Sequence, residues 1–497
     1  MSAWDVIVIG SGAGGGTVAA ALAPLAEAGR RVLVVERGPR LGVAHARPDE
    51  LASADAFYAG AGAAFTEDGT IALATGQVLG GSTALSTGVA VGPSGAVIDG
   101  WRVPGLPGAD IEARAAAMVR DAGAAYPHDA TLNENNPRFE EGALRAGFSP
   151  ERMRLLVRGC RGAGVCHLGC PNDAVLGTHA LQLPRAAAAG VRIVTRARAV
   201  AIAPQQVVVR VTADEGWPAG DHVLTAPCIV LAAGAIETTG LLLRGGFGGA
   251  LPRLGRGVTC HPAHVVVAEH PRAITNAVGH PTAYRVDRTT EDGYVLEPCF
   301  SSPLVTARNL TGFGPEHAQV LAAYPRLQML RVTARDRAAD GNRVVLDRDG
   351  EAIVRYRLAP SVRDALVAGQ RAAARVAFGA GAVRVHVPAA DPPRLDRHDM
   401  DALDRRISAA LELPGRVSLS ATQPLGGAAM SRGPRDGVTD AHGRVHGAPW
   451  LRIADGSLCP DSPGVHPVLT IMALAERVAD AVRDDLPALA GAAPAVA

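Results

Sequence analysis

The apolar residues of this chain follow two different patterns. Short apolar runs within 5–9, 31–36 and 228–234 are typical of strands buried on both faces of a parallel sheet. Within 327–356, apolar and polar residues instead alternate, and Asp340-Gly341 and Asp349-Gly350 mark turns, which is typical of an antiparallel sheet. The first pattern returns at 450–454, before a helical pattern at 469–482. The sequence therefore predicts an α/β chain, α+β overall, with an inserted antiparallel sheet.

This alternation divides the chain into three predicted parts. Residues 40–75 are predicted to be rich in loops, and 104–147 to contain helical stretches broken by proline and asparagine. We expect a discontinuous nucleotide-binding domain from residues 1–100, 175–260 and 415–485. A helical segment with a cysteine-rich loop takes up 101–174, and a substrate-binding domain with the antiparallel sheet takes up 261–414.

The first apolar run leads directly into a glycine-rich turn and an alanine-rich helix. In Gly10-Ser-Gly12-Ala-Gly14-Gly15, the glycines permit a tight turn and let the backbone approach a pyrophosphate. Amide groups at the start of the helix then face the phosphates. Glu36 ends the second strand, 21 positions after Gly15, where a carboxylate accepts hydrogen bonds from ribose hydroxyls. The pattern favours FAD or NAD over NADP; the alternative is a glycine-rich turn without a ligand.

Composition and charge exclude several classes of function. The chain has 497 residues, with 49 basic and 48 acidic side chains, so it lacks the basic excess of a nucleic-acid-binding protein. It contains no lysine, which excludes Schiff-base chemistry and a P-loop lysine. No apolar run reaches the roughly 20 residues that cross a bilayer. The first strand begins at Asp5 and leaves no room for a secretory leader, so we expect a cytoplasmic protein without a membrane span.

Three further segments carry a resemblance to one family. They are Gln77-Val-Leu-Gly-Gly-Ser-Thr83, Val230-Leu-Ala-Ala-Gly-Ala-Ile-Glu237, and the region from Leu451 through Asp455 and His466 to Ala475. Together with the glycine turn they are similar to the glucose-methanol-choline (GMC) oxidoreductases, particularly the bacterial branch near cholesterol oxidases and long-chain alcohol oxidases. The resemblance spans nearly the whole chain and is weakest in the inserted domain, where the substrate is chosen.

The resemblance implies a Rossmann-like FAD-binding domain and oxidation of a small-molecule alcohol by hydride transfer to flavin N5. The electron acceptor is oxygen or another carrier. Family members with covalent FAD use a histidine in the glycine loop, and residues 83–86 contain none, so we expect non-covalent FAD. The cofactor contacts implied by the resemblance are Gly10, Gly12, Gly15, Glu36, Arg37, Gly81, Ser82, Ser86, Val89, Val200, Ala233, Asp455, His466, Pro467 and Val468.

The two catalytic positions of the family correspond to Gln423 and His466. The first is usually a histidine, and a glutamine amide cannot take a proton near neutral pH. We therefore expect His466 to act as the base and Gln423 to orient the substrate oxygen. The alternatives are a His466 that only hydrogen-bonds flavin N1 and O2, or a proton route through an acid in the inserted sheet. The presence of glutamine also leaves open a non-oxidising flavoprotein of the same fold, such as a lyase or isomerase, or a flavin-binding protein without catalysis.

The cysteine spacing is the other distinctive feature of the sequence. Cys160, Cys166 and Cys170 resemble in spacing the three-iron cluster ligands of certain bacterial FAD-dependent glucose dehydrogenases. Packed free thiols or one local disulfide are the interpretations that we favour, so we predict no metal. No paired-histidine motif indicates zinc. Apolar or sterol-like alcohols and sugar or amino-sugar alcohols both remain open as substrates.

Overall fold

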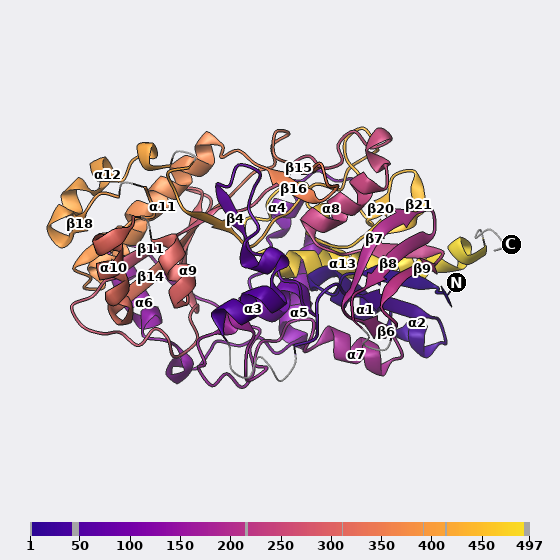
Figure 1. Cartoon of the computed structure of the whole chain (residues 1–497), viewed down its shortest axis with the longest axis horizontal. Helices are drawn as coiled ribbons and strands as arrows, with labels where there is room; N and C mark the ends of the chain where they lie inside the picture. The colour runs from indigo at the N-terminus through magenta and orange to yellow at the C-terminus, as the bar shows by residue number, and fades with distance from the viewer. Residues whose placement is uncertain are drawn as a thin grey trace.

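Two parts lie side by side along the long axis of the molecule. The computed structural model describes residues 2–41, 49–213, 217–310, 312–390, 392–412 and 415–491. Both chain ends belong to one part, and most of 261–412 forms the other (Figure 1). Among these residues no helix is long and apolar enough to cross a membrane.

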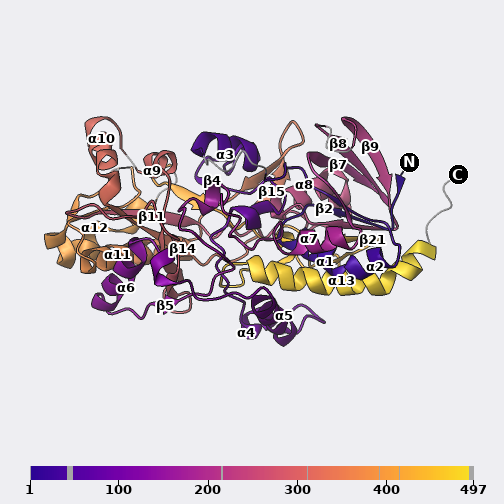
Figure 2. The same cartoon turned by 90° about the horizontal axis from the view of Figure 1, so that it is seen from below.

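The first part is built on a six-stranded sheet of order β20-β21-β10-β2-β3-β6, parallel except for β20 against β21. Every residue of the central strands is buried, as the unbroken apolar runs predict. Helices α1 and α13 pack against each other beside this sheet, and α13 runs along one side of the molecule (Figure 2). The strands are β2 (Val6–Ile9), β3 (Val32–Val35), β6 (Arg192–Val194), β10 (Cys228–Leu231), β20 (Arg444–Val445) and β21 (Ala448–Ile453), and the helices are α1 (Ala13–Ala21) and α13 (Val468–Gly491).

A four-stranded sheet of order β1-β9-β8-β7 accompanies this core. Its strands are β1 (Ser2–Ala3), β7 (Ala197–Ala203), β8 (Gln206–Val211) and β9 (Gly220–Thr225). The remaining helices of this half are α2 (Ala23–Glu27), α3 (Glu50–Phe57), α4 (Gly95–Asp99), α5 (Gly108–Asp121), α7 (Gln182–Ala188) and α8 (Ala235–Arg244).

The second part is built on a nine-stranded sheet whose main path runs β18-β17-β11-β14-β13-β12-β5, with β19 and β4 attached through β11. All pairs are antiparallel except β19 with β4. The strands are β4 (Ile71–Leu73), β5 (Glu151–Arg152), β11 (Ala263–Glu269), β12 (Tyr284–Arg288), β13 (Tyr294–Cys299), β14 (Leu327–Ala334), β17 (Arg384–His386), β18 (Leu395–Asp396) and β19 (Leu419–Ala421). Its helices are α6 (Asn135–Arg145), α9 (Pro303–Asn309), α10 (Gly314–Ala322), α11 (Pro360–Gly379) and α12 (Leu403–Arg406).

The two faces of this sheet have different partners. On β14, Leu330, Val332 and Ala334 belong to the same buried cluster as the apolar side of α11. Because side chains alternate along a strand, Met329 and Arg331 point to the opposite face. On this opposite face, Met329 belongs to a buried apolar cluster with residues of α10 and its flanking loops. Arg331 lies outside this cluster, where the same face is polar.

The predicted fold class, a Rossmann-like domain with an antiparallel sheet, is confirmed. Three local predictions were wrong or incomplete. Residues 343–355 form a separate hairpin of β15 (Arg343–Leu346) and β16 (Ala352–Arg355), which packs on α8 instead of joining the large sheet. The predicted loop at 40–75 contains α3, and the sequence analysis gave no indication of the 20-residue α11. The domain boundaries stay a prediction, and β4, β5 and β19 join the large sheet from outside 261–414.

Candidate active site

The glycine turn brings the start of α1 into direct contact with the ends of two strands. A Cβ on Gly14 would lie 1.5 Å from the Ala454 carbonyl oxygen, and a Cβ on Gly10 would lie 2.2 Å from the Ala232 carbonyl oxygen. Gly10 also has a φ of +100°, which disfavours other residues. These glycines therefore allow α1 to pack against the carboxyl ends of β10 and β21.

The N-terminus of α1 is open. Its N-cap residue Gly12 supplies no side-chain hydrogen bond, and the first turn contains no acidic residue. A Cβ on Gly12 would meet only the Cα of Gly81, at 3.8 Å. Backbone amides at such an uncapped N-terminus bind anions, and a diphosphate needs the space in front of a residue without a Cβ. The arrangement fits the diphosphate of a dinucleotide cofactor.

Glu36 holds this turn together. One carboxylate oxygen accepts hydrogen bonds from the Ser11 amide (3.0 Å) and the Ser11 hydroxyl (2.6 Å), and the other accepts one from the Gly38 amide (2.7 Å). Burial raises the pKa of Glu36, and these three bonds offset only part of the effect. The carboxylate keeps lone pairs for a ribose hydroxyl, so the predicted ribose contact is compatible with the geometry. Arg37 forms an ion pair with Glu237 at 3.0 Å.

The glycine loop after residue 77 forms many of its hydrogen bonds internally. The Ser86 hydroxyl donates to the Thr83 carbonyl (3.1 Å), and the Ser82 hydroxyl accepts from the Gly76 amide (2.8 Å). Gly81 has a φ of +53°, and Val89 is buried. The predicted contacts Gly81, Ser82, Ser86 and Val89 therefore come from one folded loop beside Gly12, and what they offer a cofactor is mainly backbone.

Two other predicted contacts, Val200 and Ala233, lie at a β-bulge and just after the end of a strand. Val200 lies at a break in the register of β7 with β8, between Ala199 and Ala201, so it has no Cα partner in this ladder. Ala233 follows β10 and is half-buried. The Asp455 carboxylate accepts hydrogen bonds from Gly234, Thr238 and Ser457. Because these bonds occupy both oxygens of Asp455, its side chain joins the ends of β10 and β21, and a cofactor contact there falls to the backbone.

The two predicted catalytic residues are in direct contact. The Gln423 side-chain amide lies 2.6 Å from Nδ1 of His466, which immediately precedes Pro467 and the start of α13 at Val468. The other ring nitrogen, Nε2, lies 2.8 Å from Oε1 of Glu297 on β13. A neutral imidazole has one N–H. Since a carboxylate accepts, Nε2 donates to Glu297, and Nδ1 keeps its lone pair and accepts from Gln423.

Glu297 is fully buried and is paired a second time. Its other oxygen accepts a hydrogen bond from the guanidinium of Arg331, the residue directly opposite it on β14. Burial alone would raise the pKa of Glu297, but the neighbouring His466 and Arg331 outweigh it and hold this pKa well below its usual range. Glu297 is therefore a carboxylate. The sequence analysis did not name it, although a lone acid inside the apolar run 294–299 is a signal for it.

A second histidine supports the loop that carries Gln423. The ring of His261 lies 3.3 Å from the Gln423 carbonyl and 2.6 Å from the Ser462 hydroxyl. His261 is buried and has a φ of +51°, which is uncommon for a residue with a side chain. Burial lowers its pKa, so the ring is neutral and serves to connect these two segments.

The three cysteines of the cysteine-rich loop, Cys160, Cys166 and Cys170, are free thiols, and so are the other four cysteines. The interpretation of a local disulfide was therefore wrong. Burial, with added repulsion from Cys170 and Cys160, raises the pKa of Cys166 to about 12, which favours the thiol over the thiolate ligand form. Within the described ranges, three potential ligand atoms lie within 4.8 Å of one another only at Asp396, His398 and Asp399. There Arg384 and Arg394 already pair with Asp396, and Arg406 pairs with Asp399.

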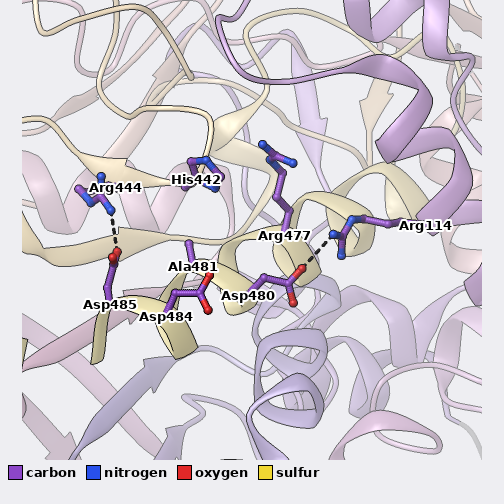
Figure 3. A pocket seen from close by; sticks show the side chains of 8 residues that line it. All are labelled: Arg114, His442, Arg444, Arg477, Asp480, Ala481, Asp484 and Asp485. Carbon is purple, nitrogen blue, oxygen red and sulfur yellow. Dashed lines mark hydrogen bonds and ion pairs between the residues drawn. The ribbon is translucent and has the colours of Figure 1, made fainter. Parts of the chain in front are cut away.

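A surface pocket of about 240 Å³ lies elsewhere, along α13 (Figure 3). Its arginines are paired with acids: Arg114 with Asp480 at 2.9 Å, and Arg444 with Asp485 at 2.6 Å. None of its lining residues belongs to the predicted site. These ion pairs connect α5 and β20 to α13.

Comparison with known proteins shows that the chain belongs to the GMC oxidoreductase family. The N-terminal and C-terminal GMC oxidoreductase models match residues 54–263 and 338–475, and an NAD(P)-binding Rossmann-like model matches residues 8–64. An uncharacterized GMC-type oxidoreductase of Mycobacterium tuberculosis is 33% identical over 96% of this chain and 75% of its own length. The long-chain-alcohol oxidase FAO4B of Arabidopsis thaliana is 25% identical over 97% of this chain and 67% of its own.

Solved structures show the same fold at low sequence identity. Pyridoxine 4-oxidase from Mesorbium loti superposes with a TM-score of 0.64 at 16% identity, over 97% of this chain and 99% of that one. A variant of Aspergillus oryzae formate oxidase, described in work on its FAD modification, superposes with a TM-score of 0.66 at 16% identity, over 98% and 99%. GMC oxidoreductases are flavoproteins that use FAD, so the resemblance inferred from the sequence is confirmed, and the chain is an oxidoreductase with a Rossmann-like FAD-binding fold.

Proposed function

We propose that this chain oxidises an alcohol to an aldehyde or ketone, with non-covalently bound FAD and with His466 as the base. The observation that carries the proposal is the pairing of His466 with the buried carboxylate of Glu297. A histidine whose one N–H is held by a carboxylate presents the lone pair of its other nitrogen in a fixed direction, as a general base requires. When bound, FAD supplies the hydride acceptor.

The pairing of His466 with Glu297 supports Nδ1 as the atom that takes the proton. Nε2 of His466 donates to Glu297, so Nδ1 accepts the proton of the substrate hydroxyl. The Gln423 amide lies at Nδ1, so the substrate oxygen takes a place beside it or displaces it. Gln423 then remains within reach to orient that oxygen. The positive charge formed on the imidazole is balanced by Glu297, and Arg331 keeps Glu297 ionised.

The cofactor would lie across the carboxyl ends of the parallel strands. Gly12 and the amides of α1 would hold the diphosphate, and Glu36 the ribose. The unpaired position of Val200 offers backbone groups for the adenine. His466, Pro467 and Val468 would lie at the flavin ring, because α13 begins there. The predicted contacts would thus form one continuous path from β7 to His466 and Gln423.

The relatives support an alcohol as the substrate. FAO4B is named for long-chain alcohols, and the match covers nearly the whole of this chain. Part of the face beside Glu297 is apolar, with Val265 and Val295 only half-buried. The electron acceptor would be oxygen or another carrier.

Anaerobic mixing tests this function directly. The purified protein is mixed with primary and secondary alcohols without oxygen, and the absorbance of oxidised flavin is followed. Loss of that absorbance with at least one alcohol class is expected. If it persists across all classes, the non-oxidising alternative, which the Gln423 amide at Nδ1 favours, replaces this proposal. Acid precipitation should release the yellow colour into the supernatant, because no covalent bond to FAD is expected.

A further inference from the structure

Arg331 on β14 and Arg335, one residue beyond the end of β14, lie near residues 464–466, the catalytic loop that carries His466. Arg331 pairs with Glu297, the partner of His466. Arg335 lies four positions after Arg331, and its amide donates a hydrogen bond to the Gly293 carbonyl, so the extended pairing with the β13 chain continues to this residue. Because side chains alternate along an extended chain, Arg335 lies on the same face of the sheet as Arg331. A Cβ built on Gly464 would lie 3.7 Å from Cζ of Arg335. Gly464 precedes His466 by two residues, so the Arg335 guanidinium lies against the segment that carries the base.

Arg335 differs from Arg331 and Arg337 because, among the residues that the structure describes, its side chain forms no ion pair. Its Nε is buried and forms no hydrogen bond, and no ion pair of its guanidinium occurs in the part of the chain that the structure describes. Arg331 pairs with Glu297, and the exposed Arg337 pairs with Asp461. A guanidinium that is partly withdrawn from water and unpaired carries a desolvation cost. A ligand with an anionic group would remove that cost.

The charges around His466 favour one anionic group. Glu297 and Arg331 neutralise each other, and burial keeps His261 neutral. Asp336, the next residue, accepts hydrogen bonds from the Cys260 amide, the Arg337 amide and the Tyr356 hydroxyl. Among the described residues, Arg335 is therefore a cation against residues 464–466 that has no acidic partner. The planar fork of a guanidinium matches a carboxylate in shape and charge. A single unpaired arginine fits a singly charged carboxylate better than a doubly charged phosphate.

We propose that the substrate is a hydroxycarboxylic acid whose carboxylate binds Arg335 while its hydroxyl lies at Nδ1 of His466. This inference rests on the proposed function. Because Arg335 lies against Gly464, the carboxylate belongs close to the hydroxyl-bearing end of the substrate. On the same face Val265 and Val295 are apolar and only half-buried, so the part of the substrate that lies there is hydrocarbon.

Binding of an unreactive pair of probes tests the carboxylate site apart from catalysis. Hexanoate and hexanamide have the same shape and no hydroxyl, and each is titrated into the FAD-loaded protein by calorimetry. Hexanoate should bind at least about tenfold more tightly, in line with a charge-assisted hydrogen bond. Arg335→Leu should abolish the difference, and Arg335→Lys should retain part of it. Arg337→Leu is the matched control and should keep the full preference.

The kinetic counterpart compares 2-hydroxyhexanoate with hexane-1,2-diol. Arg335→Leu should raise KM for the hydroxy acid at least about tenfold and leave KM for the diol unchanged. Equal binding of hexanoate and hexanamide to the wild type, or an undiminished preference in folded Arg335→Leu, would overturn the proposal. If Arg335→Leu does not fold, Arg335→Gln and the wild-type comparison decide it. If only neutral alcohols reduce the flavin, this inference is wrong and the proposed function stands. If hexanoate is preferred but no alcohol reduces the flavin, the carboxylate site stands and the proposed function is wrong.

Discussion

Nε2 of His466 lies 2.8 Å from Oε1 of Glu297, and this contact connects the cofactor-binding half of the molecule to the large antiparallel sheet. His466 lies two residues before α13, and Glu297 is on β13. The carboxylate is fully buried and shared with Arg331, its cross-strand neighbour. The sheet therefore does more than form a wall for the substrate, because it sets the tautomer of the proposed base.

Glu297→Gln keeps the size of the side chain and removes its charge. The imidazolium formed when His466 takes a proton then has no counter-charge, so the rate of anaerobic flavin reduction should fall by about 10²–10⁴. FAD content, measured by absorbance after desalting, should stay at one per chain because the substitution leaves the proposed contacts at Gly12 and Glu36 unchanged. A rate within about threefold of the wild type would show that Glu297 has no part in the proton transfer.

The same substitution should have a pH-dependent effect on stability. Removing one member of a buried ion pair should lower the free energy of unfolding by about 3–5 kcal/mol near pH 7. The pKa of Glu297 in the folded protein lies below its unfolded value, so its contribution is present above the unfolded pKa and is lost as the pH falls toward the folded one. Urea unfolding should show a constant gap between wild type and variant above about pH 5, which narrows below it. A gap independent of pH down to acid unfolding would contradict the assignment.

The sequence predicted the parts of the fold that follow from local pattern. The buried strands β2, β3 and β10 were visible as unbroken apolar runs, and the turn beginning at Gly10 was visible from its glycines. The helix α11 was missed because Pro360 starts it and alanines dilute its apolar pattern. The hairpin β15–β16 was assigned to the large sheet because alternation alone does not tell which neighbours a strand pairs with.

Site residues could be predicted from the sequence where a short motif within one segment identified them. His466 and Gln423 were located by the resemblance of two short motifs. Glu297 is 169 residues from His466 in the chain, and Arg335 becomes relevant only because Gly464 packs against it. Neither the pairing of Glu297 with His466 nor the contact of Arg335 with Gly464 corresponds to a characteristic spacing in the sequence. Both are therefore visible only in the folded structure.

Substitutions of two glycines in the turn between β2 and α1 should affect cofactor binding and folding separately. Gly12→Ala has room for its methyl group, since the Cα of Gly81 is 3.8 Å away, and the φ of −65° is ordinary. The methyl group would project where the diphosphate is expected, so FAD affinity should fall at least about tenfold with little change in the stability of the apoprotein. Gly14→Ala would overlap the Ala454 carbonyl, 1.5 Å from the new Cβ, and should destabilise the fold itself.

Calorimetric FAD titration and urea unfolding of the apoproteins distinguish the two variants. If Gly12→Ala binds FAD as tightly as the wild type does, the diphosphate does not lie in front of α1. A Gly14→Ala protein of normal stability would mean that α1 does not pack against β21 as closely as the structure shows.

The relative importance of His466 and Gln423 decides the mechanism. His466→Ala removes Nδ1, the proposed proton acceptor, and should lower the rate of anaerobic flavin reduction by about 10²–10⁴ while FAD stays bound. Gln423→Ala removes a hydrogen bond from Nδ1 and leaves the lone pair in place, so its effect should be about tenfold or less.

Gln423→His serves as the matched variant, because it restores the histidine of the family pair at the position of the 2.6 Å contact with His466. It should reduce flavin with simple alcohols at least as fast as the wild type does. The three variants are compared by stopped-flow spectroscopy at saturating alcohol, with FAD content measured on the same samples. If Gln423→Ala is severely impaired and His466→Ala is nearly as active as the wild type, the proton does not leave through Nδ1. Glu297, the acid that accepts the hydrogen bond from Nε2 of this imidazole, would then be the first group to test for a part in the proton transfer.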